Sequence, residues 1–263
     1  MYSDEHKLYL KKRKRKNFFI RLTQISIVAI FIIIWQLLAD FNLINTFITS
    51  TPKEIVNTIL SLNSDGSLWH HIWVTVYETI ISFTLGTIIG IIIATILWWN
   101  DFTAKVMDPY LTILNSLPKV ALGPIIIIWA GAGINSIILM ALLISVIITI
   151  INIYQGFVET DINKLKLMKS FKANKLQIYT KLILPSSYSN FINALKINVS
   201  MSLIGVIMGE FLVSKEGIGY LIMYGSQVFN LNLVITGIFI LAILSAFMYY
   251  IISYIEKRLI KND

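Results

Sequence analysis

The stretch LPKVALGPIIIIWAGAGINS, from Leu117 to Ser136, decides the fold of this chain. Two prolines, Pro118 and Pro124, interrupt a long apolar run that ends in a turn containing two glycines. Proline frees a backbone carbonyl in a helix, and within a bilayer that carbonyl must be satisfied by neighbouring helices or by a water-lined path. Broken membrane helices of this kind are typical of transport pathways. We therefore expect Pro118 to lie on or near such a path.

The composition of the whole chain agrees with a membrane location. Hydrophobic residues make up 56% of the 263 residues and charged residues only 14%, against about 45–50% and about 25% in ordinary soluble domains. A helix needs about 20 apolar residues to cross a bilayer. The stretches of that length predict an all-α bundle of six transmembrane helices, at residues 17–38, 72–98, 109–131, 135–156, 190–213 and 232–255.

The basic residues are distributed unevenly among the segments that connect these spans. If the N-terminus is inside, the inner segments hold 18 Lys and Arg residues and the outer segments hold two, Lys53 and Lys215. Such a bias places both termini in the cytoplasm. The net charge of +8 is therefore a topology signal, and we expect no nucleic-acid partner.

The N-terminal segment allows two interpretations. The basic run Lys11–Lys16 followed by apolar residues resembles the start of a signal peptide, but the apolar run is long and no small-x-small cleavage site follows it. We expect an uncleaved first helix, with residues 1–16 as a basic cytoplasmic N-terminus and residues 17–263 as a single transmembrane domain. The chain has no cysteine, which excludes disulfides and thiol chemistry.

Small residues recur along one side of two predicted spans. Gly86, Gly90 and Ala94 are spaced by four residues, and Ser202, Gly205 and Gly209 nearly so. Small side chains let membrane helices approach closely. The pattern therefore predicts helix packing within a bundle, with close approach to a substrate as the alternative.

The loop 157–189 is the one long polar segment between two spans. Asp161 is placed to cap a short helix that runs to about Phe171, and Asn174 and Gln177 have the spacing of a capping box at the start of a second helix. These helices carry apolar residues among six lysines. They could lie on the membrane surface or dock on a partner; the apolar residues are Leu165, Leu167, Met168, Phe171, Leu176 and Tyr179.

Four ionisable residues lie nearest to membrane depth, and each would cost several kcal/mol if it faced lipid. They are candidates for the wall or gate of a path, with structural pairing or snorkelling as the alternative: Glu78, Lys119, Lys196 and Glu210. Asn198 is a further polar candidate in the fifth span, one turn from Ser202. Its face meets either another helix or the path.

No catalytic constellation or cofactor site is visible in the sequence. His70 and His71 are adjacent, so on a helix they point about 100° apart and cannot form an i, i+4 metal pair; we expect them to be interfacial residues. The phosphate-binding pattern G-x-x-x-x-G-K-[ST] is absent. We therefore predict a protein that is not an enzyme and does not bind ATP by itself.

Several stretches resemble, in the same order, the permease subunits of nitrate/sulfonate/taurine-type ABC importers, the binding-protein-dependent transport inner membrane components. They cover residues 30–255, with Leu117–Ser136 as the most specific; the others are Thr51–Glu54, Leu68–Thr75, Asn152–Gly156 and Gly209–Ile222. The chain departs from this family at Glu78 and Ser82, where Arg and Gly are usual. It also departs at Lys166, Leu167, Met168 and Lys172, which replace the Glu-Ala-Ala and Gly of the family's coupling loop.

The resemblance implies a mechanism and partners. Two permease copies enclose the path, two ABC ATPase subunits hydrolyse ATP beneath them, and an extracytoplasmic substrate-binding protein delivers the substrate in a bacterial cell membrane. The loop 157–189 would then be a coupling loop that docks on the ATPase through Leu165, Lys166, Leu167, Met168, Phe171, Lys172, Asn174 and Gln177. We expect Leu167, Met168 and Phe171 to share one side of the first helix and to enter a groove of the ATPase.

The substrate class implied by the resemblance is a nitrate-, sulfonate- or taurine-like anion, or a pyrimidine precursor of thiamine. The alternative function is an ion-coupled secondary transporter, which usually shows two related halves of the chain. No such internal repeat is visible here.

Overall fold

The computed structural model describes residues 4–260, and the regular secondary structure in this range is helical, with no strand. Two short turns differ from α-helix: the 3-10 helix η1 (Lys119–Leu122) and the π-helical turn η2 (Tyr179–Ile183). The α-helices, in chain order, are α1 (Asp4–Asp40), α2 (Thr46–Thr49), α3 (Pro52–Ser64), α4 (Ser67–Trp99), α5 (Asp101–Ser116), α6 (Gly123–Ala130), α7 (Ile134–Val158), α8 (Ile162–Ser170), α9 (Lys175–Ile178), α10 (Leu184–Ser186), α11 (Tyr188–Val213), α12 (Ile218–Gln227) and α13 (Leu231–Ile260).

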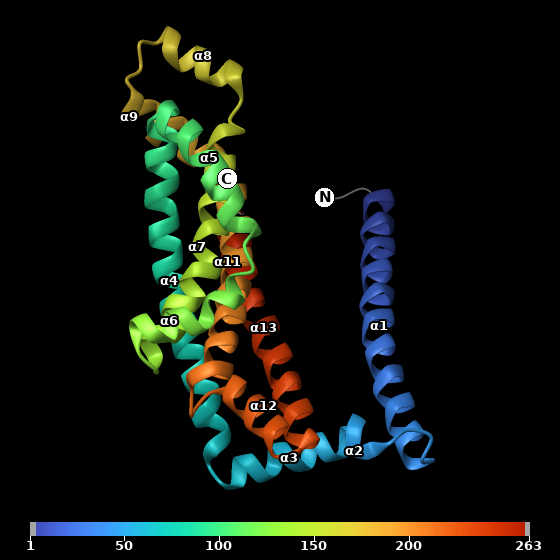
Figure 1. Ribbon diagram of the computed structural model, residues 1–263. Coiled ribbons are helices and arrows are strands. Elements are labelled where there is room, and N and C mark those ends of the chain that lie inside the picture. Colours follow the sequence, from blue (N-terminus) through green and yellow to red (C-terminus); the bar gives the residue numbers. More distant parts are fainter. Residues whose placement is uncertain (1–3, 261–263) are drawn as a thin grey trace.

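A bundle of long helices forms the body of the protein (Figure 1). Helix α7 packs against both α4 and α11, and α13 packs against α11 and α12. The glycine stripes explain why α7 comes so close. Cβ atoms added at Gly86 and Gly90 would meet Ser145 and Thr149 of α7, and Gly205 and Gly209 of α11 lie against the α7 backbone at residues 141 and 137. The predicted packing role of the small residues is thus confirmed.

The predicted break in the third span is present. Helix α5 ends at Ser116, and the segment Lys119–Ala130 follows after a bend of 85°. Within the described residues, five helices are long and apolar enough to cross a membrane, and the bent pair makes a sixth span. The prediction of a six-span helical bundle is therefore confirmed, with one difference: the third span is two helices at a steep angle, because Pro118 cannot continue α5.

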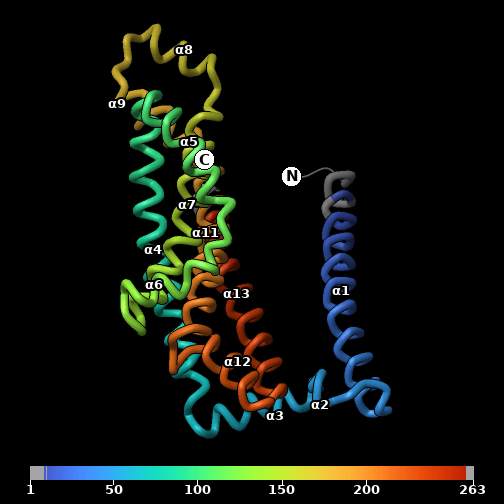
Figure 2. Tube along the Cα trace, viewed as in Figure 1, coloured from blue at the N-terminus to red at the C-terminus, as the bar shows by residue number. Residues whose placement is uncertain are grey.

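Helix α1 stands apart from the bundle, as the chain trace shows (Figure 2). Only 6% of its most apolar segment is buried within the chain. Its C-terminal end contacts α3, and Trp35 stacks on Phe239 of α13 with ring centroids 5.9 Å apart. The apolar side chains of α1 between Phe18 and Ile34 are therefore mostly exposed.

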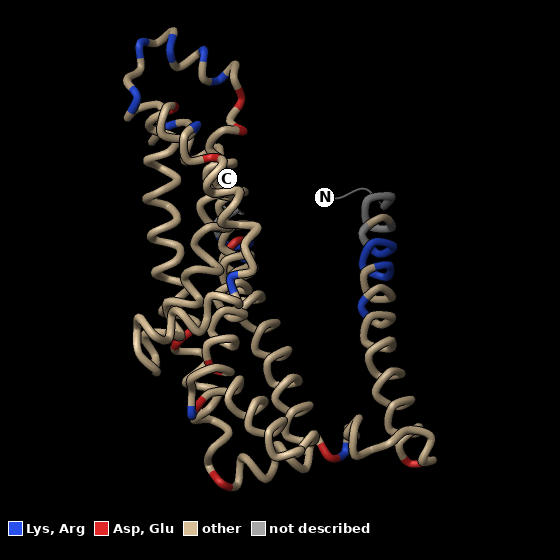
Figure 3. The backbone as a smooth tube through the Cα atoms, viewed as in Figure 1, with Lys and Arg blue, Asp and Glu red and all other residues tan. Residues whose placement is uncertain are grey.

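Charged residues occur along the whole molecule, and lysines are concentrated at one end of it (Figure 3). Lysines crowd the loop that holds α8 and α9, which we call the α8 end, and basic residues also line the first half of α1. Helices α2 and α3 lie at the opposite end, which we call the α3 end. Lys261, one of the basic residues counted in the sequence, lies outside the described residues.

Candidate functional site

Glu210 holds the loop between α11 and α12 in place. Its side chain is only 1% exposed, yet its carboxyl oxygens accept hydrogen bonds from Thr75 Oγ1, at 2.6 Å, and from the backbone N–H of Gly219. Gly219 is in the first turn of α12. A carboxylate at a helix N-terminus satisfies free N–H groups and interacts favourably with the helix dipole. Glu210 therefore joins α11, α4 and the start of α12.

The glycines of this loop are required by the same contact. Gly217 has a φ of +98°, and a Cβ atom there would overlap the carboxyl group of Glu210. A Cβ atom at Gly219 would lie 2.7 Å from Glu210 Oε2. The spacing of Glu210, Gly217 and Gly219 thus follows from a buried carboxyl group against which only bare backbone can pack.

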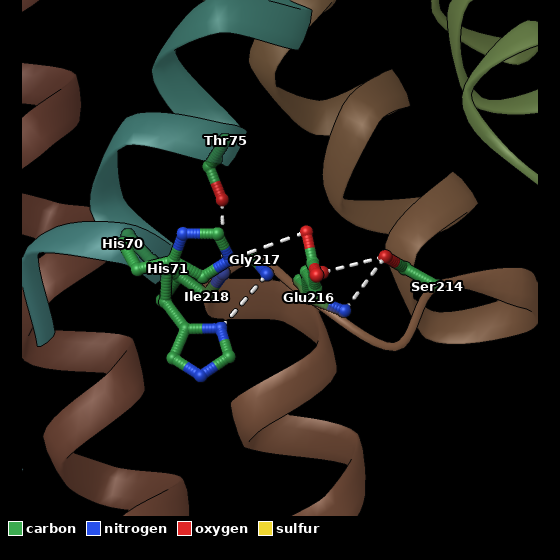
Figure 4. Close-up of polar contacts among 7 residues, drawn as sticks. All are labelled: His70, His71, Thr75, Ser214, Glu216, Gly217 and Ile218. Atoms are coloured by element: carbon green, nitrogen blue, oxygen red, sulfur yellow. Dashed lines mark hydrogen bonds and ion pairs between the residues drawn. The ribbon is translucent and has the colours of Figure 1, made fainter. Parts of the chain in front are cut away.

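Helix α4 binds the same loop through two further side chains (Figure 4). The N–H of Ile218 donates to Thr75 Oγ1 at 2.8 Å, and the N–H of Gly217 donates to His71 Nδ1 at 3.0 Å. His70 Nε2 lies 3.2 Å from the carboxylate of Glu216 at the surface. The two histidines thus have structural partners, beyond the interfacial role that we expected for them.

Glu78 lies beside this network, with its carboxyl group in contact with that of Glu210. Its side chain is 3% exposed, and its Oε2 atom is buried without a hydrogen-bond partner. Glu78 also lines a cavity of about 600 Å³, together with the aromatic residues Trp73 and Tyr77 of α4. Of the candidate path residues in the sequence, the structure brings the carboxyl groups of Glu78 and Glu210 together.

The bend in the third span has its own local partners. Pro118 is exposed at the break, and Lys119 reaches back so that its Nζ atom donates to the backbone carbonyl and the side-chain oxygen of Asn115, at 3.3 and 3.4 Å. A lysine near a helix C-terminus can donate hydrogen bonds to the free carbonyl groups and interacts favourably with the helix dipole. Lys119 therefore caps the C-terminal end of α5.

Lys196 and Asn198 connect helices of the chain itself. Lys196 Nζ forms an ion pair with Glu256 of α13 at 2.6 Å. Asn198 Nδ2 donates to Thr87 Oγ1 at 2.7 Å and to the carbonyl of Phe83 at 3.3 Å, which bridges α11 to α4. The sequence indicates both residues as path candidates, with structural pairing or a helix contact as the alternative. In the structure, both residues have partners on neighbouring helices.

The caps predicted in the loop 157–189 are present. Asp161 accepts from the N–H of Asn163 at 2.8 Å. The Asn174 side chain accepts from the N–H of Gln177, and the Gln177 side chain accepts from the N–H of Asn174, at 2.8 and 2.9 Å. The side chains of Asn174 and Gln177 are therefore engaged with their own backbone.

The apolar residues of α8 point in two directions, contrary to our expectation that Leu167, Met168 and Phe171 share one side. Leu165 and Met168 pack against the chain's own cluster at the α8 end, which includes Phe157 and Ile178. Leu167 and Phe171 are 56% and 73% exposed. On a helix, neighbours in sequence lie about 100° apart, so Met168 cannot share the exposed face of Leu167. Lys166 and Lys172 are exposed.

A contact that the sequence did not indicate ties this loop to the end of α4. Lys175 Nζ donates to the backbone carbonyl of Trp99 and lies 5.9 and 5.7 Å from the ring centroids of Trp98 and Trp99. Tyr179 OH and Thr95 Oγ1 share a hydrogen bond of 2.7 Å. We call this set of contacts the α9 clamp. The paired tryptophans could have indicated it, but they are equally typical of a membrane interface.

Residues 86–261 match the family described as binding-protein-dependent transport system inner membrane component. A probable ABC transporter permease protein of Haemophilus influenzae is 29% identical, covering 91% of this chain and 97% of that protein. A putative aliphatic sulfonates transport permease of Bacillus subtilis is 27% identical, covering 89% and 84%. The formylaminopyrimidine transport permease of Halalkalibacterium halodurans is also 27% identical, covering 87% and 90%.

Among solved structures, an inward-facing methionine ABC transporter is similar to this chain in fold, with a TM-score of 0.64 at 18% identity. The similarity covers 73% of this chain and 94% of that one. The helical bundle of this chain thus has the fold of a known ABC transporter chain.

The chain belongs to the family of binding-protein-dependent transport system inner membrane components. It is a permease subunit of an ABC importer. Membership favours ATP-driven import over the ion-coupled alternative.

Proposed function

We propose that this permease forms one half of a substrate path and is driven by two copies of a separate ABC ATPase that dock at the α8 end. The exposed pair Leu167 and Phe171 is the observation that carries this proposal. Two large apolar side chains stand on a helix rich in lysine, and apolar anchors surrounded by charged residues are typical of a protein interface. The residues around them, Lys166, Lys169 and Lys172, suit acidic groups on the partner.

The α9 clamp supplies a route from the docked ATPase to the membrane helices. Helix α8 is followed directly by α9, and Lys175 and Tyr179 attach α9 and η2 to the end of α4. Movement of the loop would therefore pull on α4, which holds Glu78 and Thr75 nearer its opposite end. The sequence itself contains no phosphate-binding loop, so ATP hydrolysis falls to the partner chain.

We further propose that the α8 end is cytoplasmic, with both termini, and that the α3 end faces an extracytoplasmic substrate-binding protein. The membrane would be that of a bacterial cell. The basic residues at the α8 end (Figure 3) support this orientation. A second copy of the chain would complete the path, since α1 stands apart with its apolar sides uncovered.

Copurification tests this assembly. We expect the tagged permease to retain the ATPase with two copies of each chain, measured by native mass spectrometry. A complex with one permease per two ATPase chains, or with a second and different permease, would contradict the homodimer. Failure of any ATPase to copurify would contradict the docking proposal.

A further inference from the structure

Two acidic side chains, Glu78 of α4 and Glu210 of α11, meet inside the bundle. Glu78 is 3% exposed and Glu210 is 1% exposed, and their carboxyl groups are in hydrogen-bond contact. Two carboxyl groups can form a hydrogen bond with each other only if one of them carries a proton. Two carboxylates at this range would repel each other strongly in a poorly screened environment. The contact therefore requires that one of the two groups is neutral.

The hydrogen bonds around Glu210 show that it is the charged member of the pair. Its oxygens accept from Thr75 Oγ1 at 2.6 Å and from the N–H of Gly219. The hydroxyl proton of Thr75 is free for this bond, because Thr75 Oγ1 itself accepts from the N–H of Ile218 at 2.8 Å. Such donors, together with the N-terminus of a helix, stabilise a carboxylate. Glu210 is therefore the carboxylate.

Glu78 lacks the donors that a second carboxylate would need. Its buried Oε2 atom accepts no hydrogen bond from an N–H or O–H group of the described residues. Burial of a carboxylate without donors is far more costly than burial of a neutral carboxyl group. The proton therefore belongs on Glu78, which donates its O–H to Glu210.

No positive charge takes the place of this proton. The ion pairs among the described residues include neither Glu78 nor Glu210. His71 accepts from the N–H of Gly217 through Nδ1 at 3.0 Å, so this nitrogen carries no proton and the ring is neutral.

The other titratable groups around the pair are exposed or half-buried: His70, Tyr77, Lys215, Glu216 and Tyr220. Glu216 lies beside His70 at the surface. Helix α6 has no titratable residue, and the described ones of α7 and α13, at positions 154 and 249–258, lie toward the α8 end. The pair thus depends on its own proton.

We propose that Glu78 is a positioning residue that carries a proton and donates a hydrogen bond to Glu210, so that one proton fastens α4 to the loop between α11 and α12. We call this contact the acid joint. Glu210 in turn holds the N–H of Gly219. When the proton leaves to water, the O–H···O bond is lost and two like charges remain in contact. The loop should then be released, so its attachment depends on pH.

Release of the loop has a consequence for the cavity of about 600 Å³ beside it. Residues 213–216, which lead into the loop and form part of it, line that cavity together with residues of α4 and α7. Loss of the acid joint should therefore widen the cavity. This pH response is separate from the docking of an ATPase at the α8 end.

Infrared spectroscopy of the purified permease in an ester-free detergent detects the proton directly. A neutral carboxylic acid has a C=O stretching band that is separate from the carboxylate bands and shifts in deuterated water. We expect this band in the parent chain at neutral pH and its loss in Glu78→Gln. Asp65→Asn, which removes an exposed carboxylate between α3 and α4, should keep the band.

Hydrogen exchange measures the hold on the loop. Between neutral and alkaline pH, the protection of the N–H groups of residues 217–219 should fall about tenfold or more in the parent chain, after correction for the intrinsic pH dependence of exchange, because a hydrogen bond to a charged group is lost. The infrared band should disappear over the same pH interval. In Glu78→Gln the side-chain amide donates to Glu210 at every pH, so the protection should stay constant. Asp65→Asn should behave like the parent chain.

The acid joint is wrong if the parent chain lacks the neutral-acid band at neutral pH, or if Glu78→Gln retains the whole band. It is equally wrong if the protection of the loop does not change with pH in the parent chain, or if it falls in Glu78→Gln as it does in the parent. The band and the protection of the parent chain test the proton by themselves, should Glu78→Gln fail to fold. Both measurements use the permease without an ATPase, so their outcome is independent of the proposed docking.

Discussion

At the scale of single residues, Glu210 shows how a buried acid can be structural in a membrane helix. It is almost completely buried, and its hydrogen-bond donors are the hydroxyl of Thr75 and the N–H of Gly219 in the first turn of α12. Desolvation of a carboxylate is costly, and hydrogen bonds with a helix dipole offset part of that cost. The sequence predicted a path or gate role for Glu210, which stays a prediction; its side chain, on α11, holds the start of α12.

The fit of Gly219 against Glu210 gives the first prediction. A methyl group at residue 219 would lie 2.7 Å from Glu210 Oε2 and 2.8 Å from its Cβ atom, so Gly219→Ala must displace the carboxyl group. We expect a loss of about 1–3 kcal/mol of stability, as is usual for overpacking. Thermal unfolding in detergent measures it, with the exposed Ser226→Ala in the same helix as the control. Equal unfolding temperatures for the two variants would contradict the tight fit.

At the scale of elements, the two faces of α8 separate docking from internal packing. Leu167 and Phe171 are exposed, whereas Met168 packs into the chain's own cluster. Leu167→Asp should therefore weaken ATPase association by more than about 2 kcal/mol, because it places a charge in an apolar contact. Quantitative copurification measures the loss, and Lys169→Ala at the rim should have a much smaller effect. If Leu167→Asp associates with the ATPase as the parent chain does, the docking proposal is wrong and the loop lies on the membrane surface instead.

Met168→Asp should behave differently from Leu167→Asp. Its charge would enter the cluster around Phe157 and Ile178, so the loop itself should lose order. We expect faster proteolysis of the loop in the purified permease without its partner, whereas Leu167→Asp should be cleaved at the parent rate. If both variants are equally resistant, the inward packing of Met168 is wrong.

The α9 clamp gives a prediction about coupling. Lys175→Met keeps an aliphatic chain but removes the hydrogen bond to the Trp99 carbonyl and the contact with the indole rings. We expect ATPase association to persist while substrate-stimulated ATP hydrolysis and uptake fall together, since α9 is then less firmly attached to α4. Hydrolysis assays in proteoliposomes measure this effect. Full stimulation in the variant would show that the clamp does not transmit the movement.

At the scale of the whole molecule, topology is the property to test, and the absence of cysteine makes the test clean. Ser64 lies at the end of α3 and Ser170 at the end of α8, at opposite ends of the bundle. A cysteine at residue 64 should react with an impermeant maleimide in cells without an accessible outer barrier, and one at residue 170 should react only after lysis. The reverse labelling pattern would mean that the α3 end, and not the α8 end, is cytoplasmic.

The sequence by itself determined the helical membrane class, the six spans, the break at Pro118 and the caps at Asp161 and Asn174. These features depend on apolar length, on proline geometry and on neighbours within a few residues, which are all readable along the chain. The family resemblance included Glu210, Gly217 and Gly219. It did not show that the two glycines leave room for the carboxyl group of Glu210.

Only the tertiary structure decided which polar membrane residues belong together. Lys196 pairs with Glu256, which is 60 positions away, and Asn198 bonds to Thr87 across a helix interface. Glu78, on α4, lies against the carboxyl group of Glu210, on α11, which is 132 positions away in the sequence. A membrane-depth charge must face protein or water, but which of the two it faces depends on helix rotation and on contacts between distant segments. The periodicity of an almost uniformly apolar helix does not specify that rotation.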